Sequence, residues 1–350
     1  MSFFDPKLCS LEPYVPGEQP KNIANLIKLN TNESPFPPSP KAVEAGKEKA
    51  KSVQLYSDPT ATELVKAIAS VSGVSEKCVA VGNGSDEVLA FLVKGFCPKG
   101  MVYNDITYGF YKVLANFFDK KSTIIELESD FTIDESKYEG VDGTVFIANP
   151  NAPTGIILPL EKIEKILLQD LNRLVVVDEA YIDFGGESAV KLLGKYQNLA
   201  ITRTYSKSRS LAGARLGYII ASEEIINGYL TVKNSFHPYN VNAITQAMGR
   251  EAMLDKEYFD FTRKEIIKNR EKLSSALKEL NFTVTDSKAN FVFASPSDGN
   301  GERLYTLLRE KGILVRYFAS ARIASYARIT VGSDEQTDAL IGALTEIYGK

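Results

Sequence analysis

One lysine in this sequence lies in a setting suited to attack on a carbonyl carbon. Lys207 follows the apolar residues 199–201 and is surrounded by small or hydroxyl-bearing residues, among them Thr204 and Ser206, with Arg215 further on. Desolvation readily lowers the pKa of a lysine, and the neutral amine forms Schiff bases with carbonyl compounds. A lone Ser-Lys-Ser sequence is more typical of a helix start with a solvated lysine, so the rest of the chain has to decide between the two.

A carboxylate provides the second chemical signal. Asp178 ends the apolar run of residues 174–177. A carboxylate at the end of a buried strand loses hydration and needs a positive partner. A protonated pyridine nitrogen would be such a partner, and Tyr181 could reach a phenolic oxygen of the same ligand. The alternatives are a helix N-cap or a magnesium carboxylate, but the latter needs a Gly-x-x-x-x-Gly-Lys-Ser/Thr loop that this sequence lacks.

A turn containing glycine connects residues 79–81 to a predicted helix. Gly84 lets the backbone approach a ligand, and the free N–H groups of Ser85 and Asp86 at the helix start would attract an anion. This pattern predicts a phosphate-binding turn. A capped helix in which Asp86 and Glu87 complement the helix dipole is an equally good interpretation of the turn alone.

Other candidates are ambiguous when each is taken alone. Tyr108 offers a flat ring for stacking, but the chain has 17 tyrosines and most of them will serve packing. Residues 149–155 follow another predicted strand and are typical of a tight turn. Arg316 and Arg328 lie near the ends of two predicted C-terminal strands, where they would bind a carboxylate or phosphate or form surface ion pairs.

Composition excludes several classes of function. A length of 350 residues predicts two domains, and a net charge of −3 disfavours nucleic-acid binding. The single histidine, His237, argues against a Ser-His-Asp hydrolase and a multi-histidine metal site, so we expect no metal. The sequence has no long apolar run and no signal-peptide pattern, and its 3 cysteines form no Cys-x-x-Cys pair. We therefore expect a cytosolic protein with reduced thiols that does not enter a membrane.

The elements that must position these groups form an α/β pattern. Between residues 79 and 230 short apolar runs alternate with helical patterns, which predicts a mainly parallel sheet covered by helices on both faces. Ligands of such sheets bind beyond the carboxyl ends of the strands, which is where Gly84, Asp178 and Lys207 are placed. Strands are predicted at residues 79–81, 101–103, 123–127, 144–148, 174–177, 199–202 and 216–220.

Two further regions flank this sheet. Residues 1–40 are rich in proline and asparagine and predict an extended arm. Residues after about 250 predict a smaller α+β domain, with helices at 258–280, 302–311 and 334–348 and strands at 282–284, 290–294, 313–316 and 327–331. We place a large domain at residues 40–245. The arm (1–39) and the C-terminal residues 246–350 together would form the smaller domain.

Together these residues resemble the class II, fold-type I aminotransferases that depend on pyridoxal 5′-phosphate. Residues 204–213 resemble the lysine attachment motif of that class. Within the class the chain looks most like the histidinol-phosphate branch. The resemblance rests on its compact length and on residues 13–14, 29–33 and 315–316. Further motifs follow in the family's order at residues 84–87, 107–109, 150–155, 178–181 and 328–332.

The resemblance implies a role for each matching residue. Lys207 would form a Schiff base with the cofactor and move a proton, and Asp178 would keep the pyridine nitrogen protonated. Tyr181 would bond the ring hydroxyl and Tyr108 would stack on the ring. The backbone of Ser85 and Asp86, with Ser206 and Arg215, would hold the cofactor phosphate. Further cofactor contacts would come from Gly84, Thr204 and Asn151. The substrate would contact Tyr14, Asn32, Arg316 and Arg328.

The resemblance also implies a homodimer, because Tyr56 resembles the residue that this family donates to the cofactor phosphate of the partner subunit. Two positions depart from the family pattern. Ala152 replaces the asparagine that bonds the ring hydroxyl, so either Asn151 substitutes for it or Tyr181 acts with less help. Arg209 replaces an aromatic or small residue, and the sequence offers no physical account of it.

The activity implied is transfer of the amino group of histidinol phosphate to 2-oxoglutarate, in histidine biosynthesis. The arginines would bind the substrate's phosphate in one half-reaction and the carboxylates of glutamate in the other. Two alternatives stay open on the same scaffold, an aromatic amino-acid aminotransferase and a threonine-phosphate decarboxylase. A third, from a different class, is a protein that binds pyridoxal phosphate or phosphate without catalysis. The last is disfavoured because a pure binder needs no proton-moving lysine.

Overall fold

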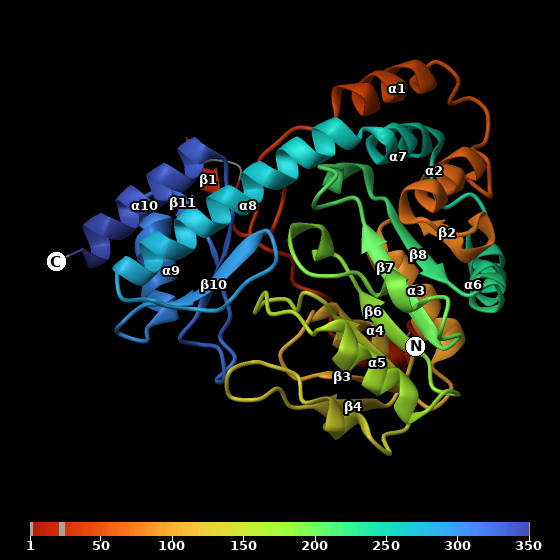
Figure 1. The fold of residues 1–350 in the computed structure, drawn as a ribbon, viewed down its shortest axis with the longest axis horizontal. Coiled ribbons are helices and arrows are strands. Elements are labelled where there is room, and N and C mark those ends of the chain that lie inside the picture. Colours follow the sequence, from red (N-terminus) through yellow and green to blue (C-terminus); the bar gives the residue numbers. More distant parts are fainter. Residues whose placement is uncertain (1–2, 21–24, 350) are drawn as a thin grey trace.

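The computed structural model describes residues 3–20 and 25–349 and contains a large central sheet with a smaller domain beside it (Figure 1). The large sheet has seven strands in the order β2-β8-β7-β6-β5-β3-β4. β8 is antiparallel to β2 and β7, and the other pairs are parallel, which confirms the predicted fold class. The strands are β2 (Val79–Gly82), β3 (Met101–Asn104), β4 (Ser122–Ile125), β5 (Thr144–Ala148), β6 (Val175–Asp178), β7 (Leu199–Thr204) and β8 (Gly217–Ala221).

Helices cover both faces of this sheet because its central strands are apolar on both faces. Val145 and Ile147 of β5 pack into one core, and Phe146 between them packs into the other, as the two-residue period of a strand requires. The helices are α1 (Pro40–Ala50), α2 (Thr62–Ser72), α3 (Ser85–Phe96), α4 (Phe110–Phe117), α5 (Leu160–Gln169), α6 (Glu223–Phe236), α7 (Ala243–Leu254), α8 (Lys256–Glu279), α9 (Gly301–Glu310) and α10 (Asp334–Tyr348). α2 and α5 contribute to the first core, and α3, α4 and α6 to the second.

The smaller domain is built on an antiparallel sheet with the order β12-β13-β10-β9. The helix α8 runs from the large domain into this one, where α9 and α10 cover the sheet (Figure 1). Residues 313–316, predicted as one strand, form two short strands that pair in different sheets. The strands are β9 (Thr283–Val284), β10 (Phe291–Ser295), β11 (Ile313–Leu314), β12 (Arg316–Tyr317) and β13 (Ala327–Thr330).

The N-terminal segment joins the smaller domain through one short strand. β1 (Ile27–Lys28) pairs in parallel with β11, and the main-chain N–H of Leu29 donates to Leu314 O at 2.8 Å. Residues 11–20 contain no helix or strand, in agreement with the predicted extended arm. The domain limits at residues 40 and 245 remain a prediction.

Short 3₁₀ helices complete the structure, at Pro6–Ser10, Glu76–Cys78, Glu135–Tyr138, Ile182–Phe184, Ala189–Leu192 and Ala212–Ala214. Within the described ranges 3–20 and 25–349, no helix has the length and apolar character of a membrane span.

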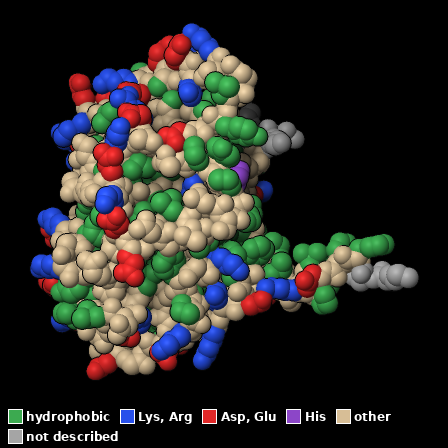
Figure 2. Space-filling view, turned by 90° about the vertical axis from the view of Figure 1, so that its right-hand side faces the viewer, with side chains coloured by type: hydrophobic (Ala, Val, Ile, Leu, Met, Phe, Trp, Pro, Cys, Tyr) green, Lys and Arg blue, Asp and Glu red, His purple; other side chains and the backbone are tan. Residues whose placement is uncertain are grey.

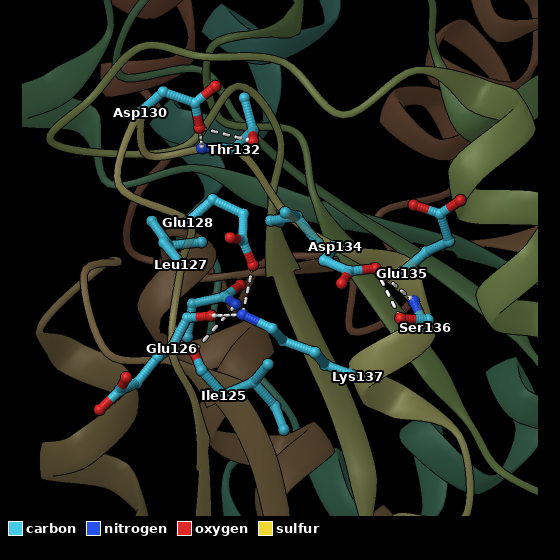
Figure 3. Close-up of polar contacts among 12 residues, drawn as sticks. Ile125, Glu126, Leu127, Glu128, Asp130, Thr132, Asp134, Glu135, Ser136 and Lys137 are labelled. Atoms are coloured by element: carbon cyan, nitrogen blue, oxygen red, sulfur yellow. Dashed lines mark hydrogen bonds and ion pairs between the residues drawn. The ribbon is translucent and has the colours of Figure 1, made fainter.

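The loop that joins β4 to β5 is fixed by its own polar side chains (Figure 3). The Asp130 carboxylate accepts from the main-chain N–H of Thr132 at 3.0 Å, and the Lys137 ammonium donates to Glu126 O at 3.2 Å. Arg322, which lies between β12 and β13, donates to Leu127 O at 2.9 Å. This loop therefore connects the large domain to the smaller one.

Candidate active site

A cavity of about 690 Å³ lies at the carboxyl ends of β5, β6 and β7, between the large sheet, the small domain and the N-terminal arm. Most of the residues predicted for the site line this one cavity, although they are spread over more than 300 positions of the sequence. They are Tyr14, Asn32, Ser85, Asp86, Tyr108, Asp178, Tyr181, Thr204, Ser206, Lys207, Arg215, Arg316 and Arg328.

Lys207 follows β7 directly and its side chain enters the cavity. The ammonium donates to the main-chain oxygen of Thr31 at 3.2 Å and lies 5.7 Å from the centre of the Tyr181 ring. Burial, together with the positive charge of Arg328, lowers the pKa of Lys207 to about 8, against the opposing effect of Glu33. A useful fraction of the amine is therefore neutral near pH 7, as a nucleophile requires.

Asp178 is the last residue of β6 and lies between Ala148 of β5 and Thr202 of β7 in the sheet register. Its carboxylate accepts from the Tyr111 hydroxyl at 3.0 Å and from the Thr202 hydroxyl at 3.1 Å. Burial outweighs these bonds and raises the pKa of Asp178 to about 6. Its described side-chain partners are all neutral, so a buried cation such as a protonated ring nitrogen would suit this carboxylate.

Tyr181 is held by Asn32 across the cavity wall. The Asn32 amide donates to the Tyr181 hydroxyl at 3.0 Å and accepts from the Thr330 hydroxyl at 3.1 Å. The Tyr181 ring also meets Phe291 edge-on, with ring centres 5.1 Å apart. Asn32, predicted to contact substrate, lines the cavity but bonds Tyr181 and Thr330. Its contact with substrate remains a prediction.

The predicted phosphate turn is open to a ligand at the start of α3. Gly84 has φ +86°, and a Cβ there would lie 2.6 Å from a guanidinium nitrogen of Arg215, so only glycine lets the two come so close. Gly84 is the N-cap residue of α3 and makes no side-chain capping hydrogen bond at the helix start. The Arg215 guanidinium lies 3.5 Å from the Ser206 hydroxyl, and that hydroxyl accepts from Thr204 at 3.0 Å. These donors fit an anion.

Tyr108 and Asp86 support each other at the edge of this turn. The Tyr108 hydroxyl donates to the Asp86 carboxylate at 2.9 Å, and Arg215 donates to its second oxygen at 3.0 Å. The carboxylate is therefore occupied, which leaves the main-chain N–H of Asp86 for an anion. Tyr14 of the arm meets the Tyr108 ring at 64°, with centres 6.4 Å apart, and closes this side of the cavity.

Two arginines face each other on the opposite wall. Arg316 of β12 is paired in register with Arg328 of β13. Arg328 donates to Asn30 O at 3.0 Å, and its buried Nε has no hydrogen-bond partner within the described structure. Two adjacent guanidinium groups fit a doubly charged anion better than a singly charged one.

Three predicted residues, Gly84, Asn151 and Tyr56, are not among the residues that line the cavity. The Asn151 amide donates to Ile106 O at 2.9 Å and accepts from the Thr107 hydroxyl at 3.0 Å, so it is used within its own turn. Ala152, not Asn151, lines the cavity. The role of Asn151 as a substitute for the missing asparagine remains a prediction, since its amide bonds residues of its own turn.

Tyr56 lies outside the cavity of its own subunit. Its side chain is 85% exposed and stacks on Tyr239, with ring centres 4.7 Å apart. The contact of Tyr56 with a partner subunit remains a prediction.

The structure adds residues that sequence reasoning missed. Tyr111 and Thr202 bond Asp178, and Glu33 and Phe318 line the cavity. Thr202 had a signal, because it ends a predicted strand as Asp178 does. Tyr111 had none, since only the packing of α4 against the sheet brings its hydroxyl to β6.

Comparison with known proteins defines the class of protein. The chain belongs to the class I and II aminotransferases, whose family model matches residues 24–344. Among curated proteins it is 49% identical to the histidinol-phosphate aminotransferase of Acinetobacter baumannii, over 99% of this chain and 97% of that protein. It is 47% identical to the enzyme of that name from Brachyspira hyodysenteriae, over 97% of each chain.

A solved structure is also similar to this chain. The histidinol-phosphate aminotransferase of Sinorhizobium meliloti, solved in complex with pyridoxal 5′-phosphate, superposes with a TM-score of 0.89 at 25% identity, over 99% of this chain and 98% of that one. The family resemblance seen in the sequence is thus confirmed.

Proposed function

We propose that this protein is a histidinol-phosphate aminotransferase that passes the amino group of histidinol phosphate to 2-oxoglutarate, in histidine biosynthesis. The observation that carries the proposal is similarity over nearly the full chain to enzymes of that name. The paired guanidinium groups of Arg316 and Arg328 support it, because they fit the phosphate of this substrate.

Pyridoxal 5′-phosphate is the cofactor that this site fits. When bound, it would supply a ring that withdraws electrons from the reacting carbon of the substrate. Asp178 would keep its ring nitrogen protonated, since the carboxylate is buried beside neutral hydroxyl groups only. Tyr181 would bond its ring hydroxyl, and the start of α3 with Ser206 and Arg215 would bind its phosphate.

Lys207 would hold the cofactor covalently and, once released by the substrate, would move the proton of the substrate carbon. Its lowered pKa suits both tasks, because the amine is neutral often enough to accept a proton near pH 7. Tyr14 and Arg316 would orient the substrate, and the arm and small domain would keep water from the cavity.

We further propose a homodimer in the cytosol. Apolar side chains are exposed between α1 and α2, where Tyr56 lies, and around the end of α6. Figure 2 shows hydrophobic side chains gathered on this side of the molecule and on the projecting arm. They include Val53, Leu55, Tyr56, Phe236 and Tyr239. The cysteines Cys9, Cys78 and Cys97 are free thiols, which suits a reducing compartment.

The substrate is tested by titrating the absorbance of the bound cofactor with histidinol phosphate, phenylalanine and threonine phosphate side by side. We expect histidinol phosphate to convert the cofactor fastest, because it alone offers both a phosphate and an imidazole of this size. A faster reaction with phenylalanine would identify an aromatic aminotransferase. Release of carbon dioxide from threonine phosphate without a keto acid would identify a decarboxylase.

A further inference from the structure

A buried lysine outside the cavity makes an unusual set of bonds. Lys233 of α6 is 2% exposed. Its Nζ donates to Pro59 O at 2.8 Å, to Pro238 O at 3.0 Å and to the side-chain oxygen of Asn234 at 3.1 Å. Three acceptors match the three hydrogens of an ammonium group, whereas a neutral amine has only two. The group is therefore a buried cation that is satisfied by oxygen atoms.

The two main-chain acceptors lie on the two loops that present an exposed aromatic pair. Pro59 O is three residues after Tyr56, and Pro238 O directly precedes Tyr239. The rings of Tyr56 and Tyr239 stack at 24°, although Tyr56 is 85% exposed. A single ammonium thus ties together the backbones that carry both rings.

Each loop is also fixed from its far side. The Asp58 carboxylate accepts from the N–H groups of Thr60 and Thr62, and Gln246 donates to Asp58 O at 2.8 Å. On the loop that carries Tyr239, Asn240 donates to the Glu87 carboxylate.

Glu87 connects this second loop to the phosphate turn of the same subunit. Its carboxylate accepts from the main-chain N–H of Asn83 at 2.6 Å as well as from Asn240. Asn83 directly precedes Gly84, at the start of α3. Glu87 therefore connects the loop that carries Tyr239 to the phosphate turn of the same subunit, while Tyr56 stays exposed, as a contact with a partner subunit would require.

We propose that Lys233 is a positioning residue for the cofactor site of the partner subunit, which acts by holding the Tyr56 loop against the Tyr239 loop. The inference rests on the proposed homodimer with Tyr56 acting in trans. A tyrosine at an exposed turn loses conformational freedom when it binds a phosphate, and a loop fixed in advance reduces that loss.

The test is a double-mutant cycle on the affinity of the full-length protein for pyridoxal 5′-phosphate. Tyr56→Phe removes one hydrogen bond to a charged group, and we expect an affinity about 10- to 100-fold lower. Lys233→Met should lower the affinity about tenfold, and the double variant should bind no more weakly than Tyr56→Phe alone. Lys94→Met, which removes an exposed lysine, is the matched control and should leave the affinity unchanged.

Additive losses, or an unchanged affinity in Lys233→Met, would overturn the inference while leaving the role of Tyr56 intact. An unchanged affinity in Tyr56→Phe would overturn both the action of Tyr56 in trans and the inference. The activity toward histidinol phosphate tests the proposed function separately. If Lys233→Met does not fold, Tyr239→Leu replaces it. Tyr239 is 42% exposed, so the fold should tolerate its loss, and the substitution removes the ring on which Tyr56 stacks. It should show the same non-additivity with Tyr56→Phe.

Discussion

At the scale of single residues, the site holds two ionisable groups whose charged forms are both disfavoured. Burial raises the pKa of Asp178 to about 6 and lowers that of Lys207 to about 8. Each group lacks a strong partner of opposite charge in the protein alone. A cofactor with a protonated ring nitrogen and a reactive aldehyde would satisfy both, so the residues are prepared for a ligand at a cost in stability.

We predict that Asp178→Asn stabilises the cofactor-free protein. The folded state binds the proton of Asp178 more tightly than the unfolded state, so this carboxyl destabilises the fold increasingly as pH rises from about 4 to about 6. Above pH 6 the substitution should recover about 3 kcal/mol of unfolding free energy, and transamination should fall about 10²-fold or more.

Urea unfolding at pH 4, 5, 6 and 7 measures the first effect. Asp286→Asn provides the control and should change the free energy of unfolding far less than Asp178→Asn, because the Asp286 side chain is 84% exposed. An equal gain in stability for Asp178→Asn at pH 4 and at pH 7 would contradict the assignment of a raised pKa.

At the scale of elements, the segment that carries Lys207 is anchored on both sides. The Ser208 hydroxyl donates to the Asp183 carboxylate at 2.5 Å. The Arg209 guanidinium lies 3.7 Å from the centre of the Phe259 ring of α8 and donates to Ala252 O of α7 at 2.9 Å. Arg209, which the sequence left unexplained, thus attaches this segment to the helices that lead into the small domain.

Replacing Arg209 should therefore cost stability more than cofactor binding. Arg209→Ala loses a cation–π contact and a charged hydrogen bond, and we expect the free energy of unfolding to fall by about 2 kcal/mol. Guanidinium unfolding measures this loss, and Arg209→Lys should retain part of the stability. A large loss of cofactor affinity with unchanged stability would instead place Arg209 within the site.

At the scale of the whole molecule, the cavity exists only because two domains and the arm meet. Two kinds of contact join the β4–β5 loop (Figure 3) to the small domain. Arg322 donates to Leu127 O of that loop. Phe131, also in the loop, packs edge-on against Phe293 and Tyr326, with ring centres 5.9 and 5.4 Å away. These contacts keep the wall with Arg316 and Arg328 opposite the wall with Lys207.

Mixing two inactive variants tests whether a second copy completes the site. Tyr56→Phe and Lys207→Ala subunits should each have low activity. Hybrid dimers should regain one normal site, formed by Lys207 of one subunit and Tyr56 of the other. Activity is measured after the subunits are exchanged under mild denaturation and reassembly. Activity no higher than the mean of the two unmixed variants would contradict the shared site.

Much of the fold follows from local patterns in the sequence. The helix at 334–348 and the strand at 144–148 are found at their predicted limits, because capping residues and an unbroken apolar run mark their ends. Boundaries are less well predicted where tertiary packing sets them. The predicted strand 313–316 is split because β11 pairs with the arm and β12 with β13.

The sequence by itself determined the α/β class and the placement of Asp178 and Lys207 at strand ends, because strand ends of a parallel sheet meet at one edge. Only the tertiary structure decided which atoms these groups contact. It bonded Asn32 to Tyr181 and Asn151 to Ile106, and it brought Tyr111 to Asp178. Hydrogen bonds between residues distant in sequence depend on how helices pack on the sheet, and no local pattern encodes that geometry.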